Sequence, residues 1–417
     1  MLKLDSYTTK LKSNHLAVKV IIFASLIQFI HSLEFMMMVP LSSDIVTGMH
    51  FNKTYTGYIT GIYVISSSLS SLVFSSVLDK FDRKKGILIS LIGMSLMTYF
   101  TTLSWSFSSV MIFRTLAGLF SGPLISLSMS MILDYVPDNK KSFAFAIVTS
   151  MLSVSSIVGV PISLILSAHA GWRLPITVLA IIGATMSVLI IIVLPKMKKH
   201  LGKLKVPQPS NMLSNPVFLK SFILTGMSIF STFLIVPQIA LYIQLNLGMS
   251  RDNLSLYYLI AGVYSFIIIN ICGRLNDKKG YVFVITLTSF ALTFIVLRAF
   301  IFVSADPAVI ALFSGFMAFS MGRTVVSVLS STAYAKPWER ANYMSLQNAS
   351  QGIFTGIASF VSSSIVYVNN GKLHNMNIVA LMSLSTFIIV PLLSLSLRRS
   401  QNTYSRINII RHSSHAL

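Results

Sequence analysis

The chain has 417 residues, of which 54% are hydrophobic and only 10% are charged. Because an ordinary soluble domain is about 25% charged, this composition excludes a soluble globular protein and predicts an integral membrane protein. A net charge of +21 would favour nucleic acid as the partner of a soluble protein. Here we assign the charge to basic loops beside the membrane, and we expect the lipid bilayer as the partner and no nucleic acid.

Hydropathy predicts an all-α fold with twelve transmembrane helices, since each span needs about 20 mostly apolar residues. The polar start of the chain is expected to be a short tail that contains no cleavable signal peptide. In chain order, the expected helices cover residues 17–40, 54–78, 86–105, 109–133, 142–168, 173–195, 217–244, 254–275, 280–303, 306–332, 341–368 and 375–397.

The two halves of the sequence repeat. The longest connection between expected helices, residues 196–216, is basic, contains proline and separates six helices from six. Asp79 and Asp277 follow the second and eighth helices and lie 198 residues apart, while Pro137 and Pro337 follow the fourth and tenth helices and lie 200 apart. This pattern predicts two duplicated six-helix bundles that rock around a site at the membrane midplane.

Lysine and arginine concentrate in the loops of one face, which predicts that this face is cytoplasmic. The loops of the other face contain little beyond Lys53, Arg173, Arg251 and Lys372. We therefore expect a multi-pass protein of the cell membrane, a bacterial inner membrane, with both termini in the cytoplasm. The expected parts are an N-terminal bundle (1–195), a cytoplasmic central loop (196–216), a C-terminal bundle (217–397) and a cytoplasmic tail (398–417).

These features resemble the major facilitator superfamily along the whole chain. Ser75-x-x-x-Asp79-Lys80-Phe81-Asp82-Arg83-Lys84 is similar to the superfamily motif Gly-x-x-x-Asp-Arg/Lys-x-Gly-Arg-Arg/Lys, although both glycines are replaced. The segment Gly273–Gly280 is a second copy that keeps both glycines. Arg114-x-x-x-Gly118-x-x-x-Gly122 resembles a second motif of the superfamily. The resemblance implies a transporter built of two six-helix bundles related by pseudo-symmetry.

A third motif points to one branch of that superfamily. Gly159-Val160-Pro161, with Ser163 at the last position, resembles the antiporter motif Gly-x-Pro-x-Gly of twelve-helix drug:proton antiporters and bacterial efflux permeases. In that branch the motif implies control of proton leak, whereas a helix kink explains Gly159 and Pro161 without it. For Gly118 and Gly122, four residues apart on one helix face, close helix packing is a sufficient explanation.

The resemblance also implies a cytoplasmic gate that holds the two bundles together in one conformation. The expected gating residues are Asp79, Arg83, Asp134 and Asp277, with Asp134 at the end of the fourth helix as an acceptor for Arg83. The alternative is that these residues form only a topology signal in a solvated loop.

Glu34 is the one acidic residue that lies deep within an expected span, where a charge costs at least about 2.5–3.5 kcal/mol. His31 lies one turn away and Gln28 another turn back, in one broad sector of the helix. The motif match favours an Arg114 that faces a central cavity; the alternative is that Arg114, some five residues into its span, extends to the outer surface. We expect Glu34, with His31 and Arg114, to carry the coupling proton; the alternative is a structural ion pair of Glu34 with His31 or Arg114.

Other polar residues inside the expected spans are candidates for a substrate cavity. Arg323 lies too deep in the tenth helix to reach the surface easily, and intramembrane charges usually face a cavity or a partner. Gln347 and Gln351 recur every four residues of the eleventh helix, so they line a substrate path or hold helices together. The remaining expected cavity residues are Gln28, Met38 and Tyr257.

The sequence predicts a proton-coupled secondary transporter that works by alternating access and exports small amphipathic compounds, as in multidrug efflux by drug:proton antiport. The alternative is a proton-coupled importer of a small nutrient such as an amino acid or metabolite. The sequence contains no metal-ligand spacing, nucleophile elbow or phosphate-binding loop. We therefore expect no enzymatic activity, no catalytic residue, no metal and no cofactor. The expected partners are a small-molecule substrate, protons and the bilayer, and the chain is expected to be a monomer.

Overall fold

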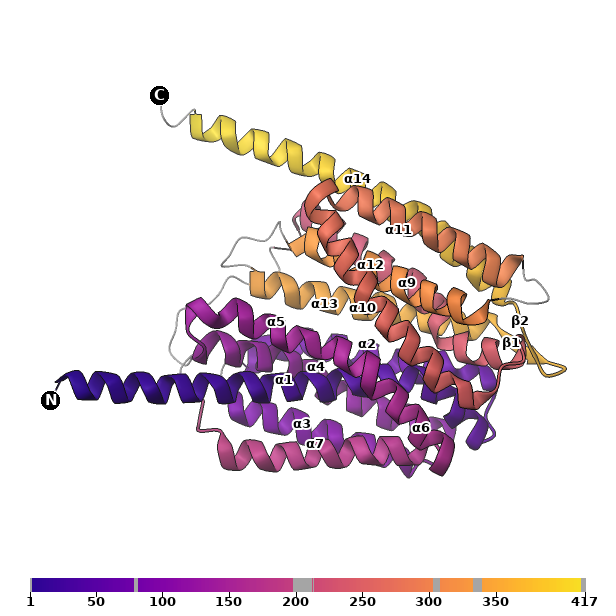
Figure 1. Cartoon of the computed structure of the whole chain (residues 1–417), viewed down its shortest axis with the longest axis horizontal. Coiled ribbons are helices and arrows are strands. Elements are labelled where there is room, and N and C mark those ends of the chain that lie inside the picture. The colour runs from indigo at the N-terminus through magenta and orange to yellow at the C-terminus, as the bar shows by residue number, and fades with distance from the viewer. Residues whose placement is uncertain are drawn as a thin grey trace. The chain divides into compact units, whose positions relative to one another are not determined.

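The computed structural model describes residues 2–78, 82–197, 212, 214–302, 308–332 and 340–413, and almost all of them are helical (Figure 1). The helices of the first half are α1 (Leu2–Gly48), η1 (Lys53–Tyr55), α2 (Thr56–Leu78), α3 (Arg83–Thr102), α4 (Phe107–Tyr135), α5 (Asp138–Val154), η2 (Ser155–Gly159), α6 (Val160–Ala170) and α7 (Arg173–Val193). The second half contains α9 (Pro216–Leu245), η3 (Arg251–Asn253), α10 (Leu254–Lys279), α11 (Tyr281–Val296), η4 (Leu297–Ile301), α12 (Val309–Thr332), α13 (Arg340–Ile365), β1 (Tyr367–Asn369), β2 (Lys372–His374) and α14 (Met376–Ser413).

A helix covers each of the twelve expected spans. Among the described residues, eleven helices are both long enough and apolar enough to cross a membrane. The remaining span corresponds to α13, which is 26 residues long but carries the polar residues Gln347, Asn348 and Gln351. The predicted all-α fold is confirmed, and α13 shows that helix length and hydropathy do not always agree in this chain.

Both terminal helices extend past their expected ends. α1 begins at Leu2 and continues to Gly48, and α14 continues to Ser413, so the described parts of both expected tails are helical. Pro40 and Pro391 lie inside these helices. The extensions follow because no glycine or further proline lies between Leu2 and Pro40, or between Pro391 and Ser413, to end the helix.

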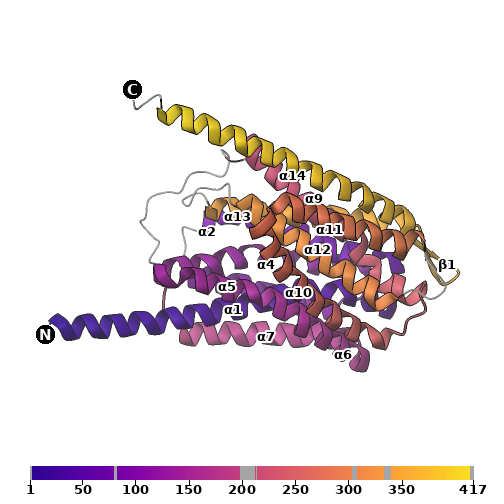
Figure 2. The same ribbon diagram turned by 45° about the horizontal axis from the view of Figure 1, so that its top comes forward.

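The described chain forms two compact units. The first contains Met1–Leu204 together with the short segment Gly248–Leu259, and the second contains Lys205–Leu247 and Ile260–Leu417. In the first unit α4 packs against α2 and α3, α3 packs against α7, and α1 packs against α4 and α5. In the second unit α9 packs against α13, α14 and α12, and α11 lies beside α14 (Figures 1 and 2). The segment Gly248–Leu259, which the sequence places in the second bundle, therefore clusters with the first unit.

The fifth span is a helix with a wider turn in its middle. α5 passes into the π-helical turn η2 over Ser155–Gly159, and α6 follows with Pro161 near its start. A π turn is one of the ordinary causes of helix bending, and it often occurs at functional sites. The turn also lies against α1, because the hydroxyl group of Ser155 donates a hydrogen bond to the carbonyl oxygen of Phe29 at 3.1 Å.

A short β-hairpin, which the sequence analysis did not predict, follows α13. α13 ends at Ile365, before the expected end at residue 368, and β1 pairs antiparallel with β2. Asn370 and Gly371 connect the strands with φ angles of 48° and 73°. An Asn-Gly pair favours such a tight turn because both residues tolerate positive φ.

Candidate functional site

Glu34 of α1 and Arg114 of α4 form an ion pair inside the first unit. Both side chains are 0% exposed. Arg114 donates from Nη1 to Oε1 of Glu34, and its guanidinium carbon lies 4.4 Å from the centre of the Tyr63 ring. The Tyr63 hydroxyl in turn lies 2.6 Å from the hydroxyl of Ser121. α1, α2 and α4 therefore meet at one buried charged cluster.

This ion pair uses only part of the hydrogen-bonding capacity of its two members. Among the described residues, Oε2 of Glu34 and the Nε and Nη2 groups of Arg114 have no hydrogen-bond partner. Arginine and carboxylate groups frequently pair through two parallel hydrogen bonds, and unpaired buried polar atoms are costly. A proton, a ligand or a water molecule that bonds to these unused atoms would therefore stabilise the cluster.

The neighbours of Glu34 on α1 are polar but do not bond to it. Gln28 donates to the hydroxyl of Ser32 at 3.1 Å. The Nε2 atom of His31 has no partner in the described part of the chain. Of the two partners that the sequence offered for Glu34, the structure pairs it with Arg114 and not with His31. Met38 is fully buried.

A second ion pair in the first unit escaped the sequence analysis. Asp44 of α1 accepts from Nε of Arg251 at 2.7 Å and also from its Nη2, and it accepts from the hydroxyl of Ser167 at 2.6 Å. The two charged side chains are 16% and 23% exposed, respectively. Asp44 lies beyond residue 40, the expected end of the first helix, whereas α1 extends to Gly48 and includes it. The sequence gave no indication that these two residues pair, because 207 residues separate them.

The expected cavity residues are distributed over both units. Gln28, Met38 and Tyr257 belong to the first unit, and the hydroxyl of Tyr257 donates to the sulfur of Met249 at 3.1 Å. Arg323, Gln347 and Gln351 belong to the second.

In the second unit, Arg323 is 0% exposed. It donates to the hydroxyl of Ser231 and, at 3.1 Å, to the carbonyl oxygen of Ser228. Gln347 is buried and approaches the carbonyl oxygen of Val328 at 3.5 Å, and Gln351 is half-buried.

A family model described as the Major Facilitator Superfamily matches residues 24–363. The chain belongs to this superfamily. The fold is similar to that of a nucleoside transporter, NupG, with a TM-score of 0.72 and 11% identity over 91% of this chain and 99% of that chain. It is also similar to a bacterial homologue of the human lysosomal transporter Spinster in an inward-facing, occupied conformation, with a TM-score of 0.72 and 14% identity over 92% of this chain and 97% of that chain. A third similar structure is a D-xylose–proton symporter, with a TM-score of 0.72 and 14% identity over 90% of this chain and 97% of that chain. This major facilitator protein is therefore a multi-pass membrane transporter of small molecules.

The superfamily loop after α2 is partly described. Asp79 lies outside the described residues. Asp82 caps α3 by accepting from the backbone nitrogens of Lys84 and Met197, each at 2.9 Å. Nε of Arg83 lies 3.3 Å from Oδ2 of Asp134, as the sequence predicted. Asp277 is exposed in the last turn of α10.

The glycines of the second superfamily motif lie where α4 crosses α2. A Cβ atom added to Gly118 would overlap the hydroxyl of Ser66, and one added to Gly122 would overlap the carbonyl oxygen of Ser67. α2 and α4 can approach this closely only without side chains at these positions. The packing explanation for Gly118 and Gly122 is therefore sufficient.

The residues of the antiporter-like motif lie against the helix that carries Glu34. A Cβ atom on Gly159 would lie 2.6 Å from Cδ1 of Leu33, the residue before Glu34. Gly159 ends the π-helical turn η2, and Pro161 lies in the first turn of α6. The π-helical turn therefore packs against the side chain of Leu33 on α1, next to the buried ion pair.

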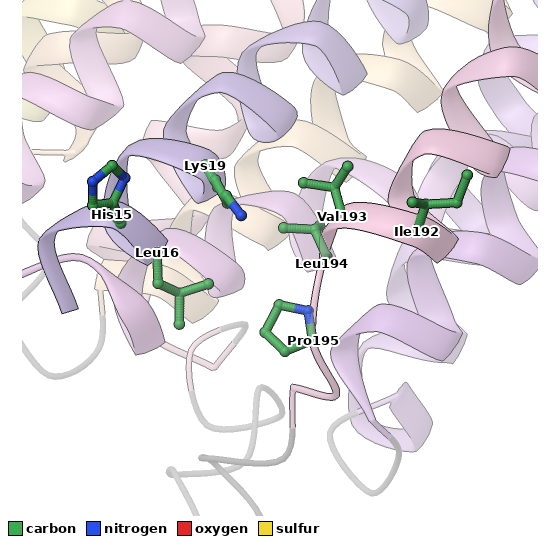
Figure 3. Close-up of a pocket in the computed structure, with 7 residues that line it drawn as sticks. All are labelled: His15, Leu16, Lys19, Ile192, Val193, Leu194 and Pro195. Carbon is green, nitrogen blue, oxygen red and sulfur yellow. The ribbon is translucent and has the colours of Figure 1, made fainter. Parts of the chain in front are cut away.

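A pocket in the first unit lies at a different place. It has a volume of about 650 Å³ and is lined by His15, Leu16 and Lys19 of α1 and by Ile192–Pro195 at the end of α7 (Figure 3). None of the expected cavity residues lines it. The buried charged cluster, and not this cavity, is the candidate functional site of this major facilitator protein.

Proposed function

We propose that this superfamily member is a proton-coupled secondary transporter and that Glu34 is its proton-carrying group, with Arg114 as its counter-charge and His31 beside it. The observation that carries the proposal is the fully buried Glu34–Arg114 ion pair with a free second oxygen on Glu34. Ionisable residues within membrane-spanning segments usually mark ion or proton pathways.

Protonation of Glu34 would change the charge of the cluster and hence the balance between conformations. With Glu34 ionised, the pair is neutral overall. When Glu34 takes up a proton, Arg114 becomes a buried cation without a counter-charge, which is costly in a low-dielectric interior. Conformations in which Arg114 reaches water or another acceptor are then favoured. Each proton that crosses with the membrane potential releases about 2.3 kcal/mol per 100 mV, which can drive the cycle.

We propose export of small amphipathic compounds as the direction of transport, so that the protein works as a drug:proton antiporter. The support is the resemblance of Gly159–Pro161 to the antiporter motif, together with the contact of Gly159 with α1 beside Glu34. Of the contacts expected for the cytoplasmic gate, the structure contains the ion pair between Arg83 and Asp134.

Proton-coupled import of a nutrient is the second candidate. One observation favours it: Arg114 and Arg323, the two arginines of the described residues that are 0% exposed, suit an anionic metabolite better than a cationic drug. The fold is shared with a D-xylose–proton symporter as well, and the same buried ion pair would serve either direction.

The test measures flux in proteoliposomes with and without an imposed pH gradient, for a fluorescent panel of amphipathic cations, anions and neutral dyes. The wild-type protein is expected to move at least one dye faster with the gradient. Glu34→Gln should lose the gradient-driven part and keep downhill exchange, because no proton can load at residue 34. Asp252→Asn removes an exposed carboxylate near Arg251 and is the control. Undiminished gradient-driven flux in Glu34→Gln would contradict the proposal.

A further inference from the structure

Arg323 lies inside the second unit, where three helices surround its guanidinium group. Its Nη2 donates to the hydroxyl of Ser231 and to the carbonyl oxygen of Ser228, both on α9. Its guanidinium carbon lies 4.7 Å from the centre of the Phe387 ring on α14. The side chain is 0% exposed. A complete positive charge is therefore held between neutral hydrogen-bond acceptors and an aromatic face.

No acidic residue in the described part of the chain pairs with this charge. Nε and Nη1 of Arg323 have no hydrogen-bond partner within the described ranges. The sequences of α9, α12 and α14 contain no aspartate or glutamate. The only acidic residues in the sequence of the second unit are Asp277, which is exposed at the end of α10, and Asp306 and Glu339, which lie outside the described residues.

The first unit offers a direct comparison. Val39-Pro40 in α1 and Val236-Pro237 in α9 are the same dipeptide, 197 residues apart, each inside the first helix of its half. At this spacing the counterpart of Glu34 is Ser231. In each unit the fourth long helix supplies an arginine to that position, Arg114 in α4 and Arg323 in α12.

The two arginines start from different levels of their helices, because Arg114 lies near the beginning of α4 and Arg323 lies beyond the middle of α12. They nevertheless meet corresponding residues of α1 and α9. Unit 1 supplies a carboxylate at this point and unit 2 supplies a hydroxyl. The second unit therefore contains the arginine of an ion pair without the acid.

We propose that Arg323 binds the carboxylate of an amphipathic monoanion, which is the substrate of the transporter. Burying an ionised group without a partner costs several kcal/mol in real proteins, and an anion that pairs with Nε and Nη1 removes that cost through charge-assisted hydrogen bonds. The Phe387 ring beside the guanidinium suits an apolar group attached to the carboxylate. This inference rests on the proposed function and names its substrate class.

A small inorganic anion could satisfy the same nitrogen atoms, so the test includes both sources of negative charge. The thermal unfolding temperature of the purified full-length protein in detergent is measured at constant ionic strength. The probes are benzoate and naphthoate, their uncharged amides, and chloride against gluconate. The measurement uses no pH gradient, so it gives an answer even if Glu34 carries no proton.

The wild-type protein should be stabilised by the carboxylates and not by the amides. In Arg323→Gln the half-saturating concentration should rise roughly tenfold or more, as expected from loss of a charge-assisted contact. Arg298→Gln, the same substitution where the guanidinium donates to the carbonyl oxygen of Phe302, should respond like the wild type. Stabilisation by chloride equal to that by the carboxylates would overturn the assignment to substrate and place an inorganic anion at Arg323.

A second variant keeps Arg323 and supplies the missing acid. Ser231→Asp should raise the unfolding temperature without any ligand and abolish the response to carboxylates, because the aspartate occupies the guanidinium. Ser231→Asn, of almost the same size, should do neither. The proposal would be overturned by a wild-type protein that does not respond to carboxylates. It would also be overturned if Arg323→Gln and Ser231→Asp respond to carboxylates as strongly as the wild type.

Discussion

Glu34 on α1 and Arg114 on α4 form a fully buried ion pair that joins one carboxylate oxygen to one guanidinium nitrogen. The two partners differ in how each one behaves when the other is removed. A carboxyl group can take up a proton and become neutral, whereas a guanidinium keeps its charge. Removal of Glu34 therefore leaves a buried cation, and removal of Arg114 leaves a group that can discharge itself.

This asymmetry gives a stability prediction. Glu34→Gln should lower the free energy of unfolding by about 3–5 kcal/mol, the usual cost of a buried charge that loses its partner. Arg114→Gln should cost less. The double variant Glu34→Gln/Arg114→Gln should regain most of the loss, because a buried ion pair is often replaceable by neutral groups. Thermal unfolding of the purified proteins measures all three, and additive losses in the double variant would show that the two charges do not interact.

Close packing of α2 on α4 gives a second prediction. Gly122→Ala should lower stability by about 1–3 kcal/mol or more, because the new methyl group meets backbone atoms of Ser67 and Ser71 that cannot rotate away. Gly273→Ala is the matched control, since no atom lies within 4 Å of its added Cβ, and alanine favours the helix. The readouts are the amount of folded protein extracted from membranes and its unfolding temperature. Equal behaviour of the two variants would contradict the close approach at Gly122.

The Asp44–Arg251 ion pair links α1 to the segment before α10 within the first unit. Asp44→Asn should lower the free energy of unfolding by about 1–3 kcal/mol, because Arg251 loses an ionised acceptor. Arg251→Gln should have a similar effect. The exchanged pair Asp44→Arg/Arg251→Asp should recover part of the loss if direct attraction between the charges is the main contribution. The wild type, Asp44→Asn, Arg251→Gln and the double variant Asp44→Asn/Arg251→Gln form a double-mutant cycle, and a coupling energy near zero from their unfolding would exclude this contribution.

Hydropathy predicted the positions of the helices well, because a backbone within a membrane must satisfy its own hydrogen bonds and long apolar runs can do so only as helices. The ends were less predictable. α1 and α14 extend past the expected boundaries because no residue in the flanking sequence stops a helix. The β-hairpin at Tyr367–His374 was missed because its Asn370-Gly371 turn lies next to an expected span.

The charged site was predictable only in part. Glu34 stood out because it is the one acid deep in an expected span, and Arg114 was one of two partners considered. Tyr63 was not identified, since an aromatic residue in an apolar helix gives no sign of the cation beside it. Asp44 and Arg251 were missed because their pairing depends on how helices pack and not on spacing along one helix. A single sequence contains little information about such contacts.

The distribution of basic residues gives the last prediction, the topology of the chain in the membrane. Cytoplasmic loops carry an excess of lysine and arginine, so Lys196 should face the cytoplasm and Lys372, in the hairpin after α13, should face outside. Both lysines are exposed, and the single native cysteine, Cys272, is buried.

In a Cys272→Ser background, Lys372→Cys should react with a membrane-impermeant maleimide added to intact cells. Lys196→Cys should react only after the membrane is permeabilised. The Cys272→Ser protein without an added cysteine measures background labelling. Reaction of Lys196→Cys in intact cells, at the rate seen for Lys372→Cys, would contradict this topology, because the five spans between the two positions, an odd number, should place them on opposite faces of the membrane.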